Sequence, residues 1–272
     1  MHRVIGLAGA LIIWEVAARW VQSPMFVPVT EVLPALIQLF VSGEIFMHIQ
    51  ASLLNILIGF SIAVIIGLAL GILVTESKIA QSILTPILDA MRPIAALTIF
   101  PLLIILLGLG MWSKVFVIFW TAWPAVLLNT AEGVRQVSKS VQEAAALDGA
   151  DGLIMLRHIT LPLALPTIIT GLRIGMGGGW ISLVSSEMLG AHAGLGYSIL
   201  AYSQTFRFPQ MYAVIIVIAL LGLSMNLALA WLQNKIDWER SGDVQESRFI
   251  RFHDRAASWV LDSPGWMQSA TG

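Results

Sequence analysis

The feature that most constrains this chain is a long apolar run between Glu44 and Glu76 that contains no Asp, Glu, Lys or Arg. A helix crosses the hydrocarbon core of a bilayer with about 20 consecutive apolar residues, and this run exceeds that length. The whole chain has the same character, because 57% of its residues are hydrophobic and only 11% are charged, against about 25% charged in soluble domains. So few charged residues cannot cover a water-exposed surface, and the sequence therefore predicts an integral membrane protein.

Apolar stretches of this kind recur along the chain and predict an all-α, polytopic membrane protein with about six transmembrane helices. The third stretch contains Pro86, Pro93 and Pro101, and since proline kinks helices we expect a broken or strongly tilted span. Residues 30–40 predict a short amphipathic helix along the membrane interface. The six predicted spans are residues 4–21, 49–75, 79–110, 115–131, 163–189 and 211–232.

The basic residues set the orientation, because Lys and Arg concentrate in cytoplasmic loops. With a cytoplasmic N-terminus and six spans, only Arg19, Lys114 and Arg207 lie outside. The basic residues inside are then Arg3, Lys78, Arg135, Lys139, Arg157, Lys235, Arg240, Arg248, Arg251 and Arg255. We therefore expect both termini to be cytoplasmic, with a single membrane domain in residues 1–238 and a polar cytoplasmic tail in residues 239–272.

One long polar connection, residues 136–162, lies on the predicted cytoplasmic side between the fourth and fifth spans. Ser140 and Glu143 have the spacing of a capping box at the start of a helix. Gly149 and Gly152 are expected to break that helix before a second short helical piece in residues 153–158, which ends at residues 159–162. The small residues of this loop would let another protein approach closely.

Seven residues of the 136–162 loop reproduce the EAA---G---------I-LP signature at every specified position, so the chain resembles the permease subunits of ABC importers. In that family the loop docks into a groove on the cytoplasmic ATPase subunit. The resemblance therefore implies an ATPase-coupling role for the residues of the signature. These residues are Glu143, Ala144, Ala145, Gly149, Ile159, Leu161 and Pro162.

The resemblance covers residues 26–238 and looks like the nitrate, sulfonate, taurine and bicarbonate branch of these permeases. The tail beyond Glu239 is longer than the family carries, and the resemblance does not explain it. The matching segments are His48-x-x-x-Ser52, Gly59-Phe60, Gly67-x-x-x-Gly71, Arg92-Pro93, Phe100-Pro101-Leu102, Gly108-Leu109-Gly110, Asn129-Thr130, Gly133-Val134, Pro166, Gly171-Leu172-Arg173, Glu187-Met188-Leu189 and Gly194-Leu195-Gly196.

The resemblance implies a multi-pass permease of a bacterial inner membrane that pairs with a second copy, or with a related permease. Its other implied partners are a cytoplasmic ABC ATPase dimer, which carries the ATP and Mg, and an extracytoplasmic substrate-binding protein. The chain itself would bind no cofactor and would not be an enzyme. The implied substrate is a small anion such as nitrate, a sulfonate or taurine, bicarbonate or an organic acid, although relatives also carry molecules similar to thiamine precursors.

Other functional classes find little support in the residues. The chain has no cysteine and a net charge of -1, which excludes thiolate chemistry and the basic surface of a nucleic-acid-binding protein. Its histidines have no metal-ligand spacing, and no catalytic constellation is evident. The competing class is a secondary transporter or channel driven by an ion gradient, which would predict inverted repeats and paired intramembrane acidic groups. Neither feature is evident.

Three ionisable residues fall at membrane depth, where charged groups face a cavity or a partner. Arg92, Arg173 and Glu187 are therefore candidates for the translocation pathway. The distance along one helix excludes direct pairing of Arg173 with Glu187. For Arg173 two interpretations stay open: a transient contact to a small oxyanion, or a structural bond to neighbouring carbonyls or an acidic partner.

Glycines spaced four residues apart predict close helix packing inside the membrane. Gly67 and Gly71 form one such pair in the second span, and Gly171, Gly175 and Gly179 form a longer series in the fifth. We expect the longer series to lie near the interface between two copies of the permease.

Overall fold

A computed structural model describes residues 2–91, 94–147 and 149–261, and for residues 2–5, 7–8 and 236–261 it describes the backbone alone. The described residues form helices and no strand, which confirms the all-α prediction. The helices are α1 (His2–Val21), α2 (Val29–Val41), α3 (Glu44–Glu76), α4 (Lys78–Met91), η1 (Ala96–Thr98), α5 (Phe100–Leu107), α6 (Met111–Arg135), α7 (Lys139–Leu147), α8 (Gly152–Met155), η2 (Leu156–Thr160), α9 (Leu161–Gly190), α10 (Leu195–Gln204) and α11 (Phe208–Leu261).

Within the described residues, four helical segments are long and apolar enough to cross a membrane: Glu44–Glu76, Met111–Arg135, Gly152–Gly190 and Phe208–Lys235. They coincide with the second, fourth, fifth and sixth predicted spans. The predicted break in the third span is also present, because α4 and α5 are short helices separated by η1. The first predicted span coincides with α1, and the count of six stays a prediction.

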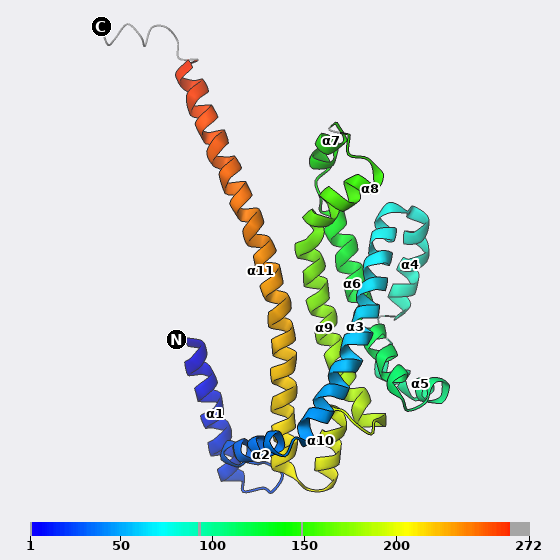
Figure 1. Cartoon of the computed structure of the whole chain (residues 1–272), viewed down its shortest axis with the longest axis vertical. Helices are drawn as coiled ribbons and strands as arrows, with labels where there is room; N and C mark the ends of the chain where they lie inside the picture. Colours follow the sequence, from blue (N-terminus) through cyan, green and yellow to red (C-terminus); the bar gives the residue numbers. More distant parts are fainter. Residues whose placement is uncertain (1, 92–93, 148, 262–272) are drawn as a thin grey trace, which may run out of the picture.

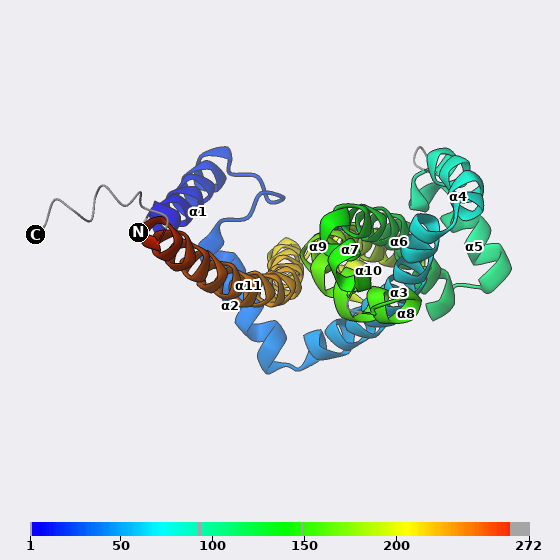
Figure 2. The ribbon, with the colours of Figure 1, turned by 90° about the horizontal axis from the view of Figure 1, so that it is seen from above.

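Helix α6 lies at the centre of the molecule, with α3 on one side and α9 on the other (Figures 1 and 2). Large apolar side chains from these three helices meet in one core, among them Ile56, Ile118 and Leu183, which are fully buried. Helix α11 packs against α9 and α10, and it continues past the predicted domain boundary at residue 238 without a break.

Different helices form the two ends of the molecule. Helices α7 and α8 form one end, and α2 and α10 lie at the other (Figure 1). At the α2 end, the Nε1 of Trp14 in α1 donates a hydrogen bond of 3.1 Å to the carbonyl oxygen of Val27. The short helix predicted at residues 30–40 is α2, which buries Val32, Ala35 and Leu39 against the rest of the chain.

Close backbone contacts hold the central three helices together at glycines. A Cβ atom built on Gly71 would lie 2.6 Å from the Cβ of Thr130 in α6, and one built on Gly67 would lie 2.7 Å from the Cβ of Val126. Such distances are shorter than any real Cβ contact allows, so α3 approaches α6 this closely only because these residues lack side chains.

The glycine series of the fifth span also packs against α6. A Cβ atom on Gly171 would lie 2.5 Å from the Cβ of Asn129, and one on Gly175 would lie 3.0 Å from the carbonyl oxygen of Ala122. Gly179 faces Ile118 in the same way. The series therefore packs within the subunit, which confirms the predicted close helix packing, and its nearness to the interface between two copies stays a prediction.

Candidate functional site

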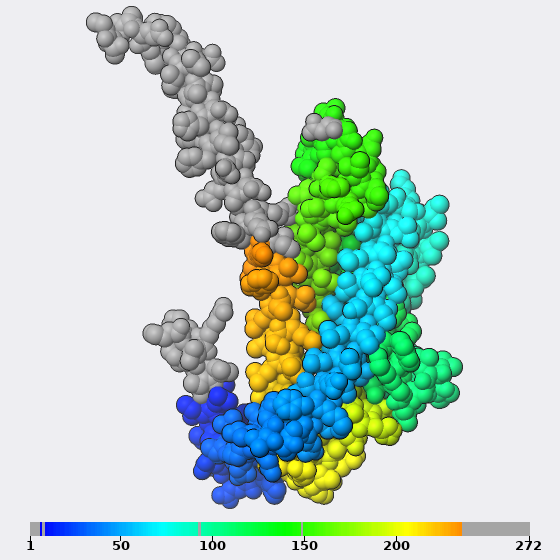
Figure 3. All heavy atoms as spheres, viewed as in Figure 1, coloured from blue at the N-terminus to red at the C-terminus, as the bar shows by residue number. Residues whose placement is uncertain are grey.

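The 136–162 loop begins where α6 ends and forms two short helices that project from one end of the molecule (Figure 3). Helix α7 begins at Lys139, and the amides of Val141 and Gln142 bond to the carbonyl oxygen of Ser138. Ser138 therefore precedes the helix, and Ser140 lies within its first turn. The predicted capping box of Ser140 and Glu143 was wrong, because Ser140 lies inside the helix and its hydroxyl bonds to that of Ser138 at 3.3 Å.

Two glycines reverse the chain after α7, as the sequence predicts. Gly149 has φ +86° and Gly152 has φ +50°, a region that residues with a side chain rarely adopt. The amides of Gly149 and Ala150 close the end of α7 by bonding to the carbonyl oxygens of Ala146 and Ala145. These bonds fix the angle at which the chain enters α8.

The predicted end of the second helical piece at residues 159–162 was wrong. Helix α8 passes through the π-helical turn η2 directly into α9, so that the helix runs from Gly152 to Gly190. Pro162 does not interrupt it, because the π-helical turn Leu156–Thr160 directly before it changes the backbone hydrogen-bond pattern at this point. The loop is therefore joined to a membrane span by continuous helix.

The signature residues lie at the surface of this loop. Glu143, Ala144, Gly149 and Pro162 are exposed, whereas Ala145, Ile159 and Leu161 are half-buried. Helix α7 has no buried residue among those described. Large apolar side chains stand beside them, since Leu147 is 90% exposed and Leu153 is 76% exposed. Small and apolar residues gathered at an exposed end are typical of a protein-docking surface.

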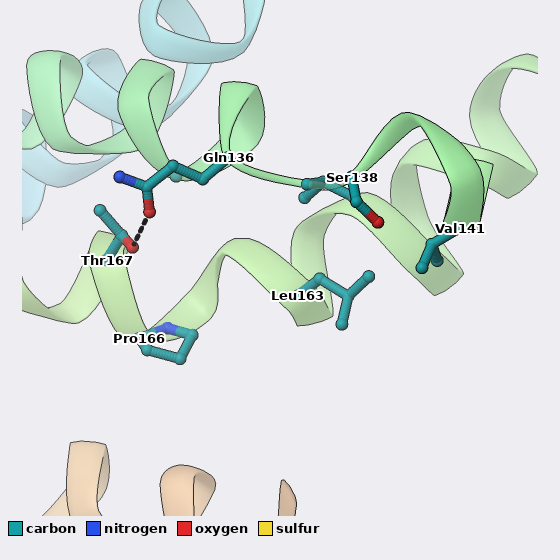
Figure 4. Close-up of a pocket in the computed structure, with 8 residues that line it drawn as sticks. Gln136, Ser138, Val141, Leu163, Pro166 and Thr167 are labelled. Atoms are coloured by element: carbon teal, nitrogen blue, oxygen red, sulfur yellow. Dashed lines mark hydrogen bonds between the residues drawn. The ribbon is translucent and has the colours of Figure 1, made fainter. Parts of the chain in front are cut away.

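A pocket of about 410 Å³ lies beneath the loop, between the end of α6, α7 and the start of α9 (Figure 4). Gln136 and Thr167 face each other across one side of it, and the Thr167 hydroxyl lies 3.5 Å from the Gln136 side-chain oxygen. The lining residues are Gly133, Gln136, Val137, Ser138, Val141, Leu163, Pro166 and Thr167.

Arg173 lies between α9 and α11 and is half-buried. Its Nε donates to the side-chain oxygen of Asn226 and its Nη1 to that of Gln233, each at 3.1 Å. The Gln233 amide nitrogen in turn donates to the Thr170 hydroxyl at 3.2 Å. This network favours the structural interpretation of Arg173, with amide carbonyls as the acceptors. Arg92 lies outside the described residues.

Replacing Arg173 with leucine is expected to lower the thermal stability of the detergent-solubilised permease, because two charge-assisted hydrogen bonds between α9 and α11 are lost. Asn226→Leu removes one of the same bonds, so the two substitutions should be non-additive by about 1 kcal/mol in a double-mutant cycle. The cycle is read from thermal unfolding midpoints. A fully stable Arg173→Leu permease that no longer transports would instead support the pathway interpretation.

Glu187 is fully buried near the end of α9. The Ser52 hydroxyl of α3 lies 2.8 Å and 2.9 Å from its two carboxylate oxygens, and the amide of Gly196 donates to Oε2 at 3.0 Å. Arg173 does not contact it, as the helix distance requires. Since the carboxylate is enclosed within one subunit, its placement favours a role in joining helices, and a pathway role stays a prediction.

Sequence reasoning missed most of the buried polar residues around Glu187. His48, Asn55 and Lys114 are each less than a tenth exposed. They come from α3 and α6, so nothing in their spacing relates them to Glu187. The one available signal was His48-x-x-x-Ser52, which places two polar side chains on the same face of an apolar helix. Among the described residues no group of acidic and histidine side chains could hold a metal ion.

Comparison with known proteins connects this geometry to a family. Residues 63–238 match the family described as binding-protein-dependent transport system inner membrane component. The chain is 34% identical over 239 residues to the taurine transport system permease protein of Escherichia coli, with 85% of this chain and 86% of that protein covered. It is also 34% identical over 244 residues to the bicarbonate transport system permease protein of Synechococcus elongatus, with 85% and 87% covered.

A further relative and a solved structure agree with these matches. The putative aliphatic sulfonates transport permease protein of Bacillus subtilis is 33% identical over 215 residues, covering 79% of this chain and 78% of that protein. An inward-facing structure of the MetNI methionine ABC transporter contains a chain of the same fold, with a TM-score of 0.62 and 17% identity. The similarity covers 71% of this chain and 95% of that one.

Proposed function

This chain belongs to the family of binding-protein-dependent transport system inner membrane components, and from that membership we propose that it is the permease subunit of an ATP-driven importer for a small anion. Two copies form the translocation pathway in a bacterial inner membrane. A separate ATPase dimer carries ATP and Mg and supplies the energy. An extracytoplasmic binding protein delivers the substrate, and the permease catalyses no covalent reaction.

The observation that carries this proposal is the exposed 136–162 loop with its seven signature residues at one end of the molecule. A surface of alanines and exposed leucines on α7 and α8 suits a groove on a partner protein, because small side chains allow backbones to approach closely. The opposite end, formed by α2 and α10, is then free to meet the binding protein. The two partners thus act on different faces of one subunit.

The substrate class rests on the relatives. The taurine, sulfonate and bicarbonate permeases are named for small molecules that carry a sulfonate or bicarbonate group, and this chain is similar to each of them over most of its length. We therefore expect a small oxyanion, with the choice among them made largely by the binding protein. Identification of the ligand that copurifies with that protein tests this part of the proposal.

The continuous helix gives the proposal a mechanism. The segment Gly152–Gly190 has 39 residues, which is roughly 58 Å at 1.5 Å per residue. It packs tightly on α6 through its glycines, so displacement of α8 by the ATPase moves α9 as a rigid element. Closure of the ATPase dimer on ATP then favours one of two conformations of the permease pair, and hydrolysis restores the other.

Single-cysteine cross-linking tests the assignment of the two faces, because the natural chain contains no cysteine. Leu147→Cys places a thiol on the loop at a side chain that is 90% exposed, and Phe206→Cys places one at the α10 end at a side chain that is 72% exposed. We expect Leu147→Cys to cross-link to the ATPase and Phe206→Cys to leave it untouched. If the ATPase cross-linked to Phe206→Cys and not to Leu147→Cys, the α10 end would face the ATPase, and this result would contradict the proposal.

A further inference from the structure

Three motifs that are far apart in the sequence meet in one buried polar cluster at the α10 end of the molecule. The cluster, here the Glu187 cluster, comprises His48 and Ser52 of α3, Glu187 of α9 and the segment Gly194–Gly196 at the start of α10. All these residues are buried, and Ser52 and Glu187 are inaccessible to solvent. The polar groups therefore interact with one another and not with water.

Each of the first backbone amides of α10 has a partner in this cluster. The amide of Gly194 donates to Nδ1 of His48 at 3.2 Å, that of Leu195 to the Ser52 hydroxyl at 2.9 Å, and that of Gly196 to Glu187 at 3.0 Å. The first amides of a helix have no acceptor within the helix and favour a negative charge. Glu187 and Ser52 thus cap α10 from two other helices.

The glycines of α10 are required by the same contact. A Cβ atom on Gly194 would overlap the carboxylate of Glu187, and one on Gly196 would overlap the carbonyl oxygen of Val184 and the Cβ of Glu187. Gly194 also has φ +127°, which residues with a side chain avoid. The backbone of α10 therefore rests directly on α9 at Glu187.

A second bond joins the other end of α10 to α3. The Tyr202 hydroxyl donates to Oε1 of Glu44 at 2.9 Å. Burial, together with this hydrogen bond, raises the pKa of Tyr202 to about 12, so the hydroxyl stays protonated as the donor. Helix α10 is thus held at both ends, by Glu187 to α9 and by Glu44 to α3.

Hydrogen bonds offset the cost of burying the Glu187 carboxylate in this cluster. A buried carboxylate is costly unless it is paired or hydrogen-bonded, and Glu187 accepts bonds from Ser52 and Gly196. Glu187 therefore joins α9 to α3 through Ser52 and to α10 through Gly196.

From this arrangement we propose that Glu187 is a positioning residue that transmits movement of α9 to α10, and so links the 136–162 loop to the face that meets the binding protein. The inference rests on the proposed function of the chain as an importer permease. Helix α9 begins at the loop and reaches Glu187 near its other end. Without the Glu187 contact, α10 would lose its orientation relative to α9, and the signal between the two faces would weaken.

The test uses the assembled complex of permease, ATPase and binding protein, with Glu187→Gln as the principal variant. Hydrogen exchange is measured at the amides of residues 194–198, and ATP hydrolysis is measured against binding-protein concentration. We expect exchange at these amides to accelerate about tenfold, since their acceptor loses its negative charge and a neutral amide oxygen accepts more weakly. The binding-protein concentration for half-maximal stimulation should rise by a similar factor.

Matched variants separate positioning from general destabilisation. Ser185→Ala removes a hydroxyl that bonds only to Ile181 of its own helix, and it should change neither measurement. Ser52→Ala should shift both in the direction of Glu187→Gln, and it carries the test alone if Glu187→Gln does not assemble. Exchange that accelerates equally in α3, α6 and α9 would reduce Glu187 to a general structural role and overturn the inference.

The outcomes also separate this inference from the proposed function. If the natural complex shows no stimulation of ATP hydrolysis by the binding protein, the proposed function fails. If the natural complex is stimulated and the assembled variants have the same half-maximal concentration and the same exchange at residues 194–198, only the inference about Glu187 fails.

Discussion

Replacing Gly171 with leucine is expected to leave almost no folded permease in the membrane. The Cβ alone would lie 2.5 Å from the Cβ of Asn129 and 3.1 Å from the carbonyl oxygen of Ala125, so α9 and α6 would have to separate. Overpacking of a core costs about 1–3 kcal/mol and occasionally more, and a leucine at a backbone contact belongs to the severe cases. The amount of folded protein is measured by size-exclusion chromatography in detergent.

A matched pair of alanine variants tests whether the loss of stability comes from the contact between α9 and α6. Gly171→Ala should be destabilising by about 2 kcal/mol. Gly177→Ala, six residues along the same helix, has no atom within 4 Å of its new Cβ and should be neutral or stabilising by up to about 1 kcal/mol from helix propensity. Equal thermal unfolding midpoints for the two variants would show that close packing on α6 does not hold α9.

Replacing Gly149 with valine is expected to abolish transport while the permease remains folded. Gly149 has φ +86°, and a β-branched residue there costs about 1–3 kcal/mol, which the exposed loop relieves by changing the path between α7 and α8. Under the proposed function, Glu143 and Ala145 of α7 then no longer face the ATPase together with Ile159, which lies beyond the reversal. Transport should fall to a few per cent of its natural rate, measured as uptake by cells that lack the natural permease.

Gly43→Val provides the control, because Gly43 has a similar φ of +78° and open space around it but lies at the other end, just before α3. Both variants carry comparable backbone strain, so both should lower the thermal unfolding midpoint by a similar amount. Only Gly149→Val should abolish transport while the ATPase continues to hydrolyse ATP. Equal loss of transport in the two variants would attribute the effect to strain and not to the loop.

Much of the fold was predictable because a bilayer imposes length and composition on each crossing helix. Four of the predicted spans coincide with long apolar helices. The third span is broken as predicted, with Pro101 at the start of α5, whereas Pro86 lies inside α4 and Pro93 lies outside the described residues. The continuity of α8 with α9 was not predictable, since Pro162 ordinarily marks a helix boundary and only the π-turn before it avoids one. The glycine patterns indicated close packing but not the partner, because spacing on one helix says nothing about which helix lies against it.

The 136–162 loop could be predicted from the sequence, whereas the Glu187 cluster at the other end could not. The 136–162 loop is local in sequence, so its signature could be found by inspection, and its glycine reversal was placed correctly. The Glu187 cluster joins residues from three parts of the chain, and no local pattern relates Ser52 to Gly196. Arg173 was identified as a candidate, but its acceptors Asn226 and Gln233 lie on α11 and could not be paired with it from spacing.

The most direct test of the central claim is substrate uptake by proteoliposomes that contain the permease and its ATPase, with the binding protein on one side and ATP on the other. The account predicts uptake that requires ATP and the binding protein, that stops with a hydrolysis-deficient ATPase, and that is unaffected when ion gradients are collapsed. Uptake that persists with the hydrolysis-deficient ATPase and stops when ion gradients are collapsed would contradict it, and would identify the chain as a gradient-driven transporter.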